Sequence, residues 1–247
     1  HFSFIGGESF LHKDIFRFFW LLDTHRKTYE ITSNATLLDN DMINKLKSCI
    51  GLKQINISID GDQHYHNSIR GKGVYQKCIK AIQMIDFVPV TVCTVAQKDN
   101  VHIIPLLSVQ LAKLGIKKHK IIYGMHMPKG QRIGHYQYQG PICNPITNVE
   151  DCQKIFKQLM YVKHRTGIDV SYEPTVWRTQ TQHFLAQNAA AQSHVSCRQL
   201  DHMRFTPKGE RIICEFIRDH YESDIAKDIK EHPLPICQQC CKLHTHD

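Results

Sequence analysis

Residues 54–61 have the sequence Gln54-Ile55-Asn56-Ile57-Ser58-Ile59-Asp60-Gly61. Isoleucine recurs through the first six positions, and β-branched residues fit the pleated surface of a sheet. Asp-Gly then follows, a dipeptide typical of turns. The stretch predicts a strand over residues 54–59 with polar side chains at its carboxyl end.

The same kind of run recurs along the chain, and amphipathic stretches separate the runs. Further strands are predicted at Phe2–Ile5, Tyr29–Thr32, Pro89–Val95, Lys118–Tyr123 and Asp169–Tyr172. Helices are predicted at Asp41–Ile50, Val74–Ile85, Pro105–Leu114 and Val149–Arg165, with Gly115 and Gly167 ending the last two. Strands that alternate with helices indicate βα units around a parallel sheet, so the predicted fold class is α/β.

The composition is that of an ordinary soluble globular protein. The chain has 247 residues, of which 42% are hydrophobic and 22% charged, enough for one or two domains. The longest apolar run, Phe18–Leu22, is far shorter than the roughly 20 residues that cross a membrane. No signal peptide is visible, and we expect a cytoplasmic protein without a membrane partner.

Charge and histidine content point to no further partner class. The net charge is +8, but Lys and Arg are scattered and no basic run alternates with aromatic residues, which argues against nucleic-acid binding. His64 and His66 would share one face if this segment were extended, and a metal site there is the weaker interpretation. A nicotinamide or flavin enzyme would need a Gly-x-Gly-x-x-Gly turn, which the sequence lacks.

Three regions are predicted: an α/β domain over residues 1–178, a connector over 179–193 rich in Gln, Ala and Asn, and a cysteine-bearing extension over 194–247. Five of the ten cysteines follow residue 196. Within the extension, Arg204–Thr206 and Arg211–Ile213 flank Pro-Lys-Gly-Glu and predict a β-hairpin.

Chemically informative residues follow the first three predicted strands, and in parallel sheets ligands bind at these carboxyl ends. Gly6-Gly7-Glu8 would let the backbone approach a ligand and offers a carboxylate to an ammonium group. Arg70 offers a planar fork to a carboxylate, while Asn34 and Ser58 suit the hydroxyl groups of a sugar. The set therefore predicts a site for an amino-acid nucleoside.

These motifs, in this order, resemble the radical S-adenosylmethionine enzymes. The resemblance rests on Phe4–Glu8, Thr32–Leu38, Ile57–Gly61 with His66, and Ile69–Gly73, and extends over about residues 2–134. It implies a partial (β/α)6 TIM-like barrel that holds S-adenosyl-L-methionine and a [4Fe–4S] cluster. It assigns the methionyl amine to Gly6, Gly7 and Glu8, and the ribose or carboxylate to Ser58 and Arg70. Asn34 and Asp60 are further candidates.

The sequence departs from that family in two places. Ser9 stands where the family usually has proline, a change that leaves the amine contact possible. The Cys-x3-Cys-x2-Cys loop that holds the catalytic cluster does not occur among the ten cysteines. We therefore expect this chain by itself not to bind that cluster or cleave the cofactor, and the activity to belong to a longer parent.

The C-terminal cysteines resemble the SPASM or twitch extension of these enzymes. Eleven residues separate Cys197 from Gly209 and four separate Gly209 from Cys214, and Cys237, Cys240 and Cys241 follow. The resemblance implies one or two auxiliary [4Fe–4S] clusters on these five cysteines. A zinc knuckle and buried free thiols are the alternatives. Four further cysteines, Cys49, Cys78, Cys93 and Cys152, are predicted to be thiols of the core and not cluster ligands.

The resemblance implies an oxidoreductase or maturase that generates a 5′-deoxyadenosyl radical and abstracts a hydrogen atom from a peptide or protein, as peptide maturases and sulfatase maturases do. It implies a reducing partner such as flavodoxin or ferredoxin. The alternative is a non-catalytic barrel or zinc-binding scaffold that serves as a binding module. The missing cysteine loop favours the alternative, and the retained Glu8, Ser58 and Arg70 favour the enzyme.

Overall fold

The computed structural model describes residues 1–124, 132–133, 136–137, 144–189, 204–205 and 211–212. The chain forms two compact units. The first comprises His1–Ile122 and Ile155–Ser171, and the second comprises Tyr123–Lys154 and Tyr172–Asp247. The predicted boundaries at residues 178 and 193 stay predictions.

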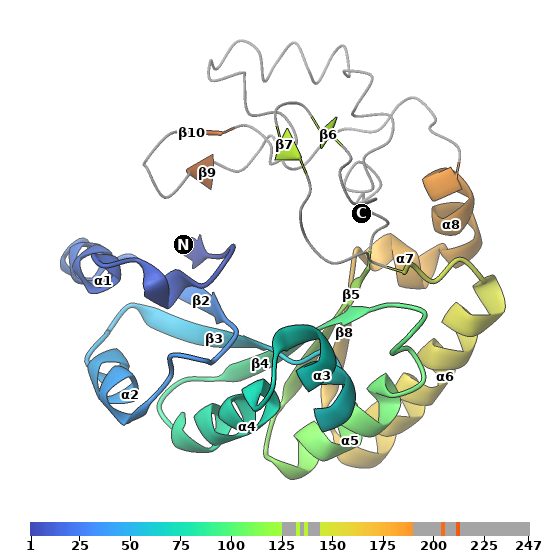
Figure 1. Cartoon of the computed structure of the whole chain (residues 1–247), viewed down its shortest axis with the longest axis horizontal. Helices are drawn as coiled ribbons and strands as arrows, with labels where there is room; N and C mark the ends of the chain where they lie inside the picture. Colours follow the sequence, from blue (N-terminus) through green and yellow to red (C-terminus); the bar gives the residue numbers. More distant parts are fainter. Residues whose placement is uncertain (125–131, 134–135, 138–143, 190–203, 206–210, 213–247) are drawn as a thin grey trace. The chain divides into compact units, whose positions relative to one another are not determined.

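Strands and helices alternate along the chain (Figure 1). The main sheet has six strands in the order β1(Phe2–Phe4), β2(Tyr29–Ser33), β3(Leu52–Ser58), β4(Val90–Ala96), β5(Lys118–Tyr123) and β8(Asp169–Glu173). The pairs β1–β2, β2–β3 and β3–β4 are parallel. The predicted α/β class is confirmed, and each predicted strand is present to within two residues at either end.

Helices fill the connections between these strands. They are η1(Ser9–Leu11), α1(Ile15–Thr24), α2(Asn40–Lys47), α3(Gln63–Arg70), α4(Val74–Met84), α5(Ile104–Lys113) and α6(Val149–Thr166). Figure 1 shows α2, α4 and α5 along one side of the sheet. Gly115 and Gly167 have φ angles of 86° and 72°, as predicted for the residues that end α5 and α6.

Two helices depart from the sequence predictions. His64 and His66 lie in α3, so the extended segment that would place both on one face does not form. Asp62 caps this helix by accepting a hydrogen bond from the Tyr65 backbone N–H, which favours helix over extended chain. Helix α1 was not predicted: its buried residues Ile15 and Phe19 have helical spacing, but the exposed apolar side chains of Phe18, Trp20 and Leu21 obscure the pattern in the sequence.

The two faces of the sheet differ in polarity. On β3, Ile55 and Ile57 are fully buried and pack toward the helices, whereas the alternating Gln54 and Asn56 project to the opposite face. Hydrogen bonds join this polar face across three strands: Ser3 to Glu30, Gln54 to Glu30 and Asn56, and Asn56 to Thr32. Ser58 continues the same alternation, so its hydroxyl belongs to the polar face.

The second unit has a small aromatic core of its own. The rings of Trp177 and Phe184 pack edge-on against Tyr123, and the indole N–H of Trp177 donates to the Cys152 sulfur at 3.3 Å. Trp177 is completely buried, whereas Trp20 of the first unit is 65% exposed. This unit also contains α7(Thr175–Thr179), α8(Thr181–Ala189) and the two-residue strands β6(Arg132–Ile133) and β7(Tyr136–Gln137).

The predicted hairpin in the cysteine-bearing extension is confirmed. Strands β9(Arg204–Phe205) and β10(Arg211–Ile212) pair antiparallel, with Arg204 opposite Ile212. The cysteines on either side of the hairpin lie outside the described residues. In the part of the chain that the structure describes, no helix is both long and apolar enough to cross a membrane.

Candidate cofactor site

The loop after β1 has the backbone conformation that glycine favours. Gly6 and Gly7 have φ angles of 86° and 41°, in the left-handed region. Both are exposed, and a Cβ atom at either position would meet no other atom within 4 Å. Backbone conformation therefore requires glycine here, and the open space above the loop leaves the main chain accessible to a ligand.

Glu8, at the end of this loop, joins the first strand to the second. Its Oε2 accepts a 2.7 Å hydrogen bond from the Asn34 backbone N–H, and its Oε1 accepts a 2.9 Å bond from the Ser33 hydroxyl. Oε1 also accepts from the Phe10 backbone N–H at 3.3 Å, which caps η1. The carboxylate is therefore fixed at the carboxyl ends of β1 and β2, and it remains only partly buried.

Asn34 sits in a tight turn that its own side chain stabilises. Its Oδ1 accepts hydrogen bonds from the backbone N–H and the hydroxyl of Thr36, at 2.9 and 2.6 Å. The next residue, Ala35, has a φ of 61° and donates its N–H to the Ser33 hydroxyl oxygen. Among the described residues the Asn34 Nδ2 has no partner, so it can donate to a ligand.

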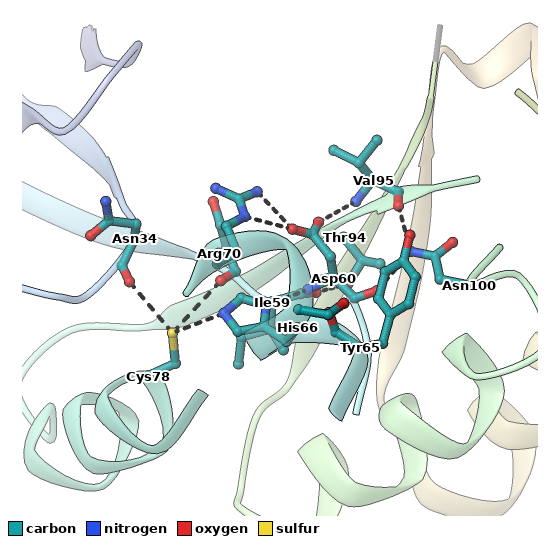
Figure 2. Close-up of polar contacts among 12 residues, drawn as sticks. Asn34, Ile59, Asp60, Tyr65, His66, Arg70, Cys78, Thr94, Val95 and Asn100 are labelled. Carbon is teal, nitrogen blue, oxygen red and sulfur yellow. Dashed lines mark hydrogen bonds and ion pairs between the residues drawn. The ribbon is translucent and has the colours of Figure 1, made fainter. Parts of the chain in front are cut away.

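Asp60 and Arg70 form an ion pair at the end of β3, in which the carboxylate is buried and the guanidinium is partly exposed (Figure 2). The Arg70 Nε and Nη2 lie 2.8 and 2.7 Å from the Asp60 Oδ2, and the other carboxylate oxygen accepts from the Val95 backbone N–H at 3.0 Å. The Asp60 side chain is 2% exposed and that of Arg70 is 34% exposed. Both carboxylate oxygens of Asp60 therefore accept hydrogen bonds from protein donors, and the carboxylate orients a guanidinium that is partly exposed to solvent.

A hydrogen-bonded chain connects the ion pair to the ends of β2 and β3. The Asp60 backbone N–H donates to the Nδ1 of His66 at 3.1 Å, and the His66 Nε2 lies 3.8 Å from the Cys78 Sγ. That sulfur lies 3.5 Å from the Asn34 carbonyl oxygen and 3.7 Å from the Ser58 carbonyl oxygen. Figure 2 shows Cys78 below Asn34 with His66 between it and Asp60.

Burial keeps the side chains of His66 and Cys78 uncharged. It lowers the pKa of His66, an effect that the nearby Asp60 carboxylate opposes and the Arg70 guanidinium reinforces. Burial also raises the pKa of the Cys78 thiol to about 12, against a smaller opposing effect of Arg70. Cys78 is therefore a thiol hydrogen-bond donor at neutral pH, and its predicted place in the core is confirmed.

A second buried histidine supports the neighbouring strand. His119 on β5 is fully buried, and its Nε2 and Nδ1 each lie 2.8 Å from a hydroxyl oxygen, those of Thr94 and Ser108. The Thr94 hydroxyl also donates to the Ile59 carbonyl oxygen. Burial lowers the pKa of His119 to about 3, so the ring is neutral at physiological pH.

The predicted site residues of the first three strands therefore form one connected network. Glu8 contacts the Asn34 backbone, Cys78 bridges the Asn34 and Ser58 carbonyls, and His66 links Cys78 to the Asp60–Arg70 pair. Asn100 adds to it by donating from its Nδ2 to the Asp60 and Val95 carbonyl oxygens, at 2.6 and 2.8 Å.

Sequence reasoning did not assign site roles to Ser33, Cys78 and Asn100. Ser33 lies next to a predicted site residue, and Asn100 lies four residues after the end of β4, so position alone could have pointed to both. Cys78 offered no such signal, because it lies on the apolar face of α4 and its partners are backbone carbonyls.

The described residues include no group of three or more Cys, His, Asp or Glu side chains that could hold a metal ion. Within residues 1–124 and 144–189 the four cysteines are Cys49, Cys78, Cys93 and Cys152, and none is in a disulfide bond. The predicted ligands Cys197, Cys214, Cys237, Cys240 and Cys241 lie outside the described residues, so their role stays a prediction.

No protein-family model and no curated protein matches the sequence. Among solved structures, Streptococcus suis SuiB superposes on 94% of this chain with a TM-score of 0.64 and 14% identity. The two chains share one fold. SuiB bound to S-adenosylmethionine aligns over 98% of this chain with a TM-score of 0.60, and SuiB bound to precursor peptide SuiA over 94% with a TM-score of 0.64, both at 14% identity.

This chain covers 55%, 59% and 54% of the SuiB chains in the three structures, so it spans little more than half their length. At 14% identity the likeness shows the fold alone. That fold is the α/β type implied by the resemblance to radical S-adenosylmethionine enzymes.

Proposed function

We propose that this chain binds S-adenosylmethionine at the carboxyl ends of β1, β2 and β3, as part of a radical S-adenosylmethionine enzyme. The observation that carries the proposal is the network that joins Glu8, Asn34, Ser58 and Arg70 within one compact unit. A second observation supports it, since SuiB has the same fold and has been crystallised with S-adenosylmethionine.

The donor set fits the polar parts of this cofactor. Glu8 offers a partly exposed carboxylate to the methionyl ammonium group, beside the accessible backbone of Gly6 and Gly7. Arg70 uses Nε and Nη2 for Asp60, and its Nη1, which has no partner among the described residues, can donate to the methionyl carboxylate.

Neutral groups remain for the ribose. Ser58 projects from the polar face of the sheet, and among the described residues its hydroxyl has no hydrogen-bond partner. The Asn34 Nδ2 lies at the end of the adjacent strand. A hydroxyl and an amide donor on neighbouring strands suit the two vicinal hydroxyl groups of a ribose.

When bound and reduced by an iron–sulfur cluster, S-adenosylmethionine supplies a 5′-deoxyadenosyl radical that can abstract a hydrogen atom. The described residues do not fit such a cluster, because they contain no group of three suitable ligands. In this proposal the described residues bind the amino-acid tail and the ribose and fix their orientation.

The proposed substrate is a peptide or protein. The support is that a structure of SuiB contains its precursor peptide, SuiA. Auxiliary clusters on the five C-terminal cysteines and an electron donor such as flavodoxin or ferredoxin belong to the same proposal. The competing function is a zinc-binding scaffold or binding module of the same fold.

Equilibrium dialysis with radiolabelled S-adenosylmethionine tests the proposal, using protein reconstituted anaerobically with iron and sulfide. We expect saturable binding that excess unlabelled cofactor displaces and excess methionine alone displaces poorly. Metal analysis of the same sample separates the two functions. Absence of saturable binding, with zinc as the bound metal, would refute the proposal in favour of the scaffold.

A further inference from the structure

Cys78 is a buried thiol within hydrogen-bond distance of two strand ends. It is fully buried on α4, and its sulfur lies 3.5 Å from the carbonyl oxygen of Asn34 and 3.7 Å from that of Ser58. The parallel pairing of β2 with β3 ends at Ser33 and Ile57, one residue before each carbonyl. The thiol therefore continues the contact between the two strands where their own ladder stops (Figure 2).

The direction of the hydrogen bonds fixes the tautomer of His66. A backbone N–H can only donate, so the Nδ1 that faces the Asp60 N–H at 3.1 Å must be the unprotonated nitrogen. The ring proton is then on Nε2, which faces the Cys78 sulfur at 3.8 Å. Because the sulfur accepts from His66, its own proton is available to one of the two carbonyl oxygens.

The three links all run in one direction, from the Asp60 backbone through His66 and Cys78 to the ends of β2 and β3. Four charged or titratable groups surround His66: Asp60, Arg70, Cys78 and Tyr75, whose ring packs edge-on at 6.1 Å. The lowered pKa of His66 and the raised pKa of Cys78 agree with an uncharged imidazole and an uncharged thiol.

We propose that His66 and Cys78 are positioning residues of the cofactor site. Cys78 sets the separation of the two strand ends that carry Asn34 and Ser58, and His66 links these strand ends to the ion pair that orients Arg70. This role rests on the proposed function. Neither residue contacts the ligand in this scheme. Cys78 acts through the main chain of Asn34 and Ser58, and His66 acts through the main chain of Asp60, which orients Arg70.

Sulfur is suited to this position because of its reach. A hydroxyl donor needs its acceptor within about 2.5–3.0 Å, whereas the two carbonyl oxygens lie 3.5 and 3.7 Å from the sulfur. Serine at position 78 would keep the polarity of the thiol but could not reach either oxygen without pulling the strand ends inward. Cys78→Ser therefore changes geometry with little change in chemistry.

The experiment compares Cys78→Ser and Cys78→Ala with Ile82→Ala. Ile82 lies one turn further along α4 and is 5% exposed, so its truncation removes more packing but none of the hydrogen bonds that link Asp60, His66 and Cys78. His66→Asn is a fourth variant. The asparagine Oδ1 can replace the His66 Nδ1 as acceptor for the Asp60 N–H, but the shorter side chain has no group that reaches the Cys78 sulfur. Each reconstituted protein is measured for S-adenosylmethionine affinity by equilibrium dialysis and for its melting temperature by circular dichroism.

We expect both Cys78 variants and His66→Asn to weaken the affinity by about three- to tenfold, the fold-change that one hydrogen bond corresponds to. Ile82→Ala should lower the melting temperature at least as much while leaving the affinity unchanged. Nitrogen NMR of the imidazole should show the Nε2–H tautomer in the wild type and in Ile82→Ala.

Two outcomes would overturn the positioning role alone: equal affinities for Cys78→Ala and Ile82→Ala, or an Nδ1–H tautomer of His66 in a wild-type protein that binds the cofactor. Failure of the wild type to bind S-adenosylmethionine would refute the proposed function, and the positioning role with it.

Discussion

Arg70 directs both its Nε and its Nη2 at a single oxygen of Asp60, at 2.8 and 2.7 Å. The other oxygen of the carboxylate is held by the backbone of β4, through the Val95 N–H. The position of the guanidinium is therefore set by two neighbouring strands and not by its own flexible side chain. An arginine oriented in this way loses less entropy when it binds an anion.

Asp60→Asn should destabilise the protein by about 2–3 kcal/mol, because it leaves Arg70 without its anion and turns an amide N–H toward either Arg70 or the Val95 N–H; the exposed part of Arg70 moderates the cost. Urea unfolding followed by circular dichroism measures the change. The matched control is Asp62→Asn, two residues away, where asparagine can cap α3 as well as aspartate does. Equal stability of the two variants would contradict a stabilising role of the Asp60–Arg70 pair.

Glu8→Gln should weaken S-adenosylmethionine binding by about 10- to 100-fold, the range for loss of a charge-assisted hydrogen bond. The amide also places a donor where either the Asn34 N–H or the Ser33 hydroxyl now donates. Equilibrium dialysis gives the affinity.

Glu30→Gln is the control for this change. Glu30 also joins β1 to β2, through Ser3, but it is the second residue of β2 and lies near the amino end of that strand, away from Glu8. Its substitution should leave the affinity unchanged. If the Glu8 and Glu30 variants bind equally well, Glu8 does not hold the amine.

His119 should make the protein less stable in mild acid. Burial lowers its folded-state pKa from 6.5 to about 3, so between these values the unfolded chain binds more protons. The stabilisation is fully present above pH 6.5 and is lost as the pH falls toward 3. Between pH 7.5 and 5.5 we expect the unfolding free energy to drop by about 1.4 kcal/mol from this residue.

Urea titrations at several pH values, followed by circular dichroism, test this dependence. His119→Gln should flatten the slope of unfolding free energy against pH over this range, whatever its effect on stability at pH 7.5. His164→Gln, on the exposed face of α6, should leave the slope as it is. His66, whose pKa is also lowered by burial, adds a contribution of the same sign.

Replacing Cys197 or Cys214 with alanine should lower the iron content of reconstituted protein, because the spacing of these residues resembles that of auxiliary-cluster ligands. Cys49→Ala serves as the control, since Cys49 lies beside the Lys45 carbonyl in the first unit. Iron analysis and visible absorbance give the readout. An iron content that falls only in the Cys49 variant would reverse the assignment of the thiols.

The sequence predicted the sheet well because its strands carry strong local signals. Isoleucines alternate along β3, and Gly115 and Gly167 mark where α5 and α6 end. The same logic did not find α1, whose core face is only Ile15 and Phe19 and whose other apolar residues, Phe18, Trp20 and Leu21 among them, are exposed, so that the run Phe18–Leu22 could equally belong to a buried strand.

Which residues belong to the candidate site was partly visible in the sequence, but their contacts were not. Glu8 and Arg70 were found because they follow strands, where parallel sheets bind ligands. That Arg70 is paired to Asp60, and that Cys78 lies between two strand ends, depends on residues 10 to 44 positions apart meeting in space. No spacing rule encodes such contacts.

The positions of the two tryptophans decide which unit intrinsic fluorescence reports on. Trp177 is sealed inside the second unit and should shift its emission to longer wavelength when that unit unfolds, whereas Trp20 of the first unit already faces water and should change little. Intrinsic fluorescence therefore reports on unfolding of the second unit. A denaturation curve recorded by fluorescence would stay nearly constant while the strand ends around Glu8, in the first unit, unfold.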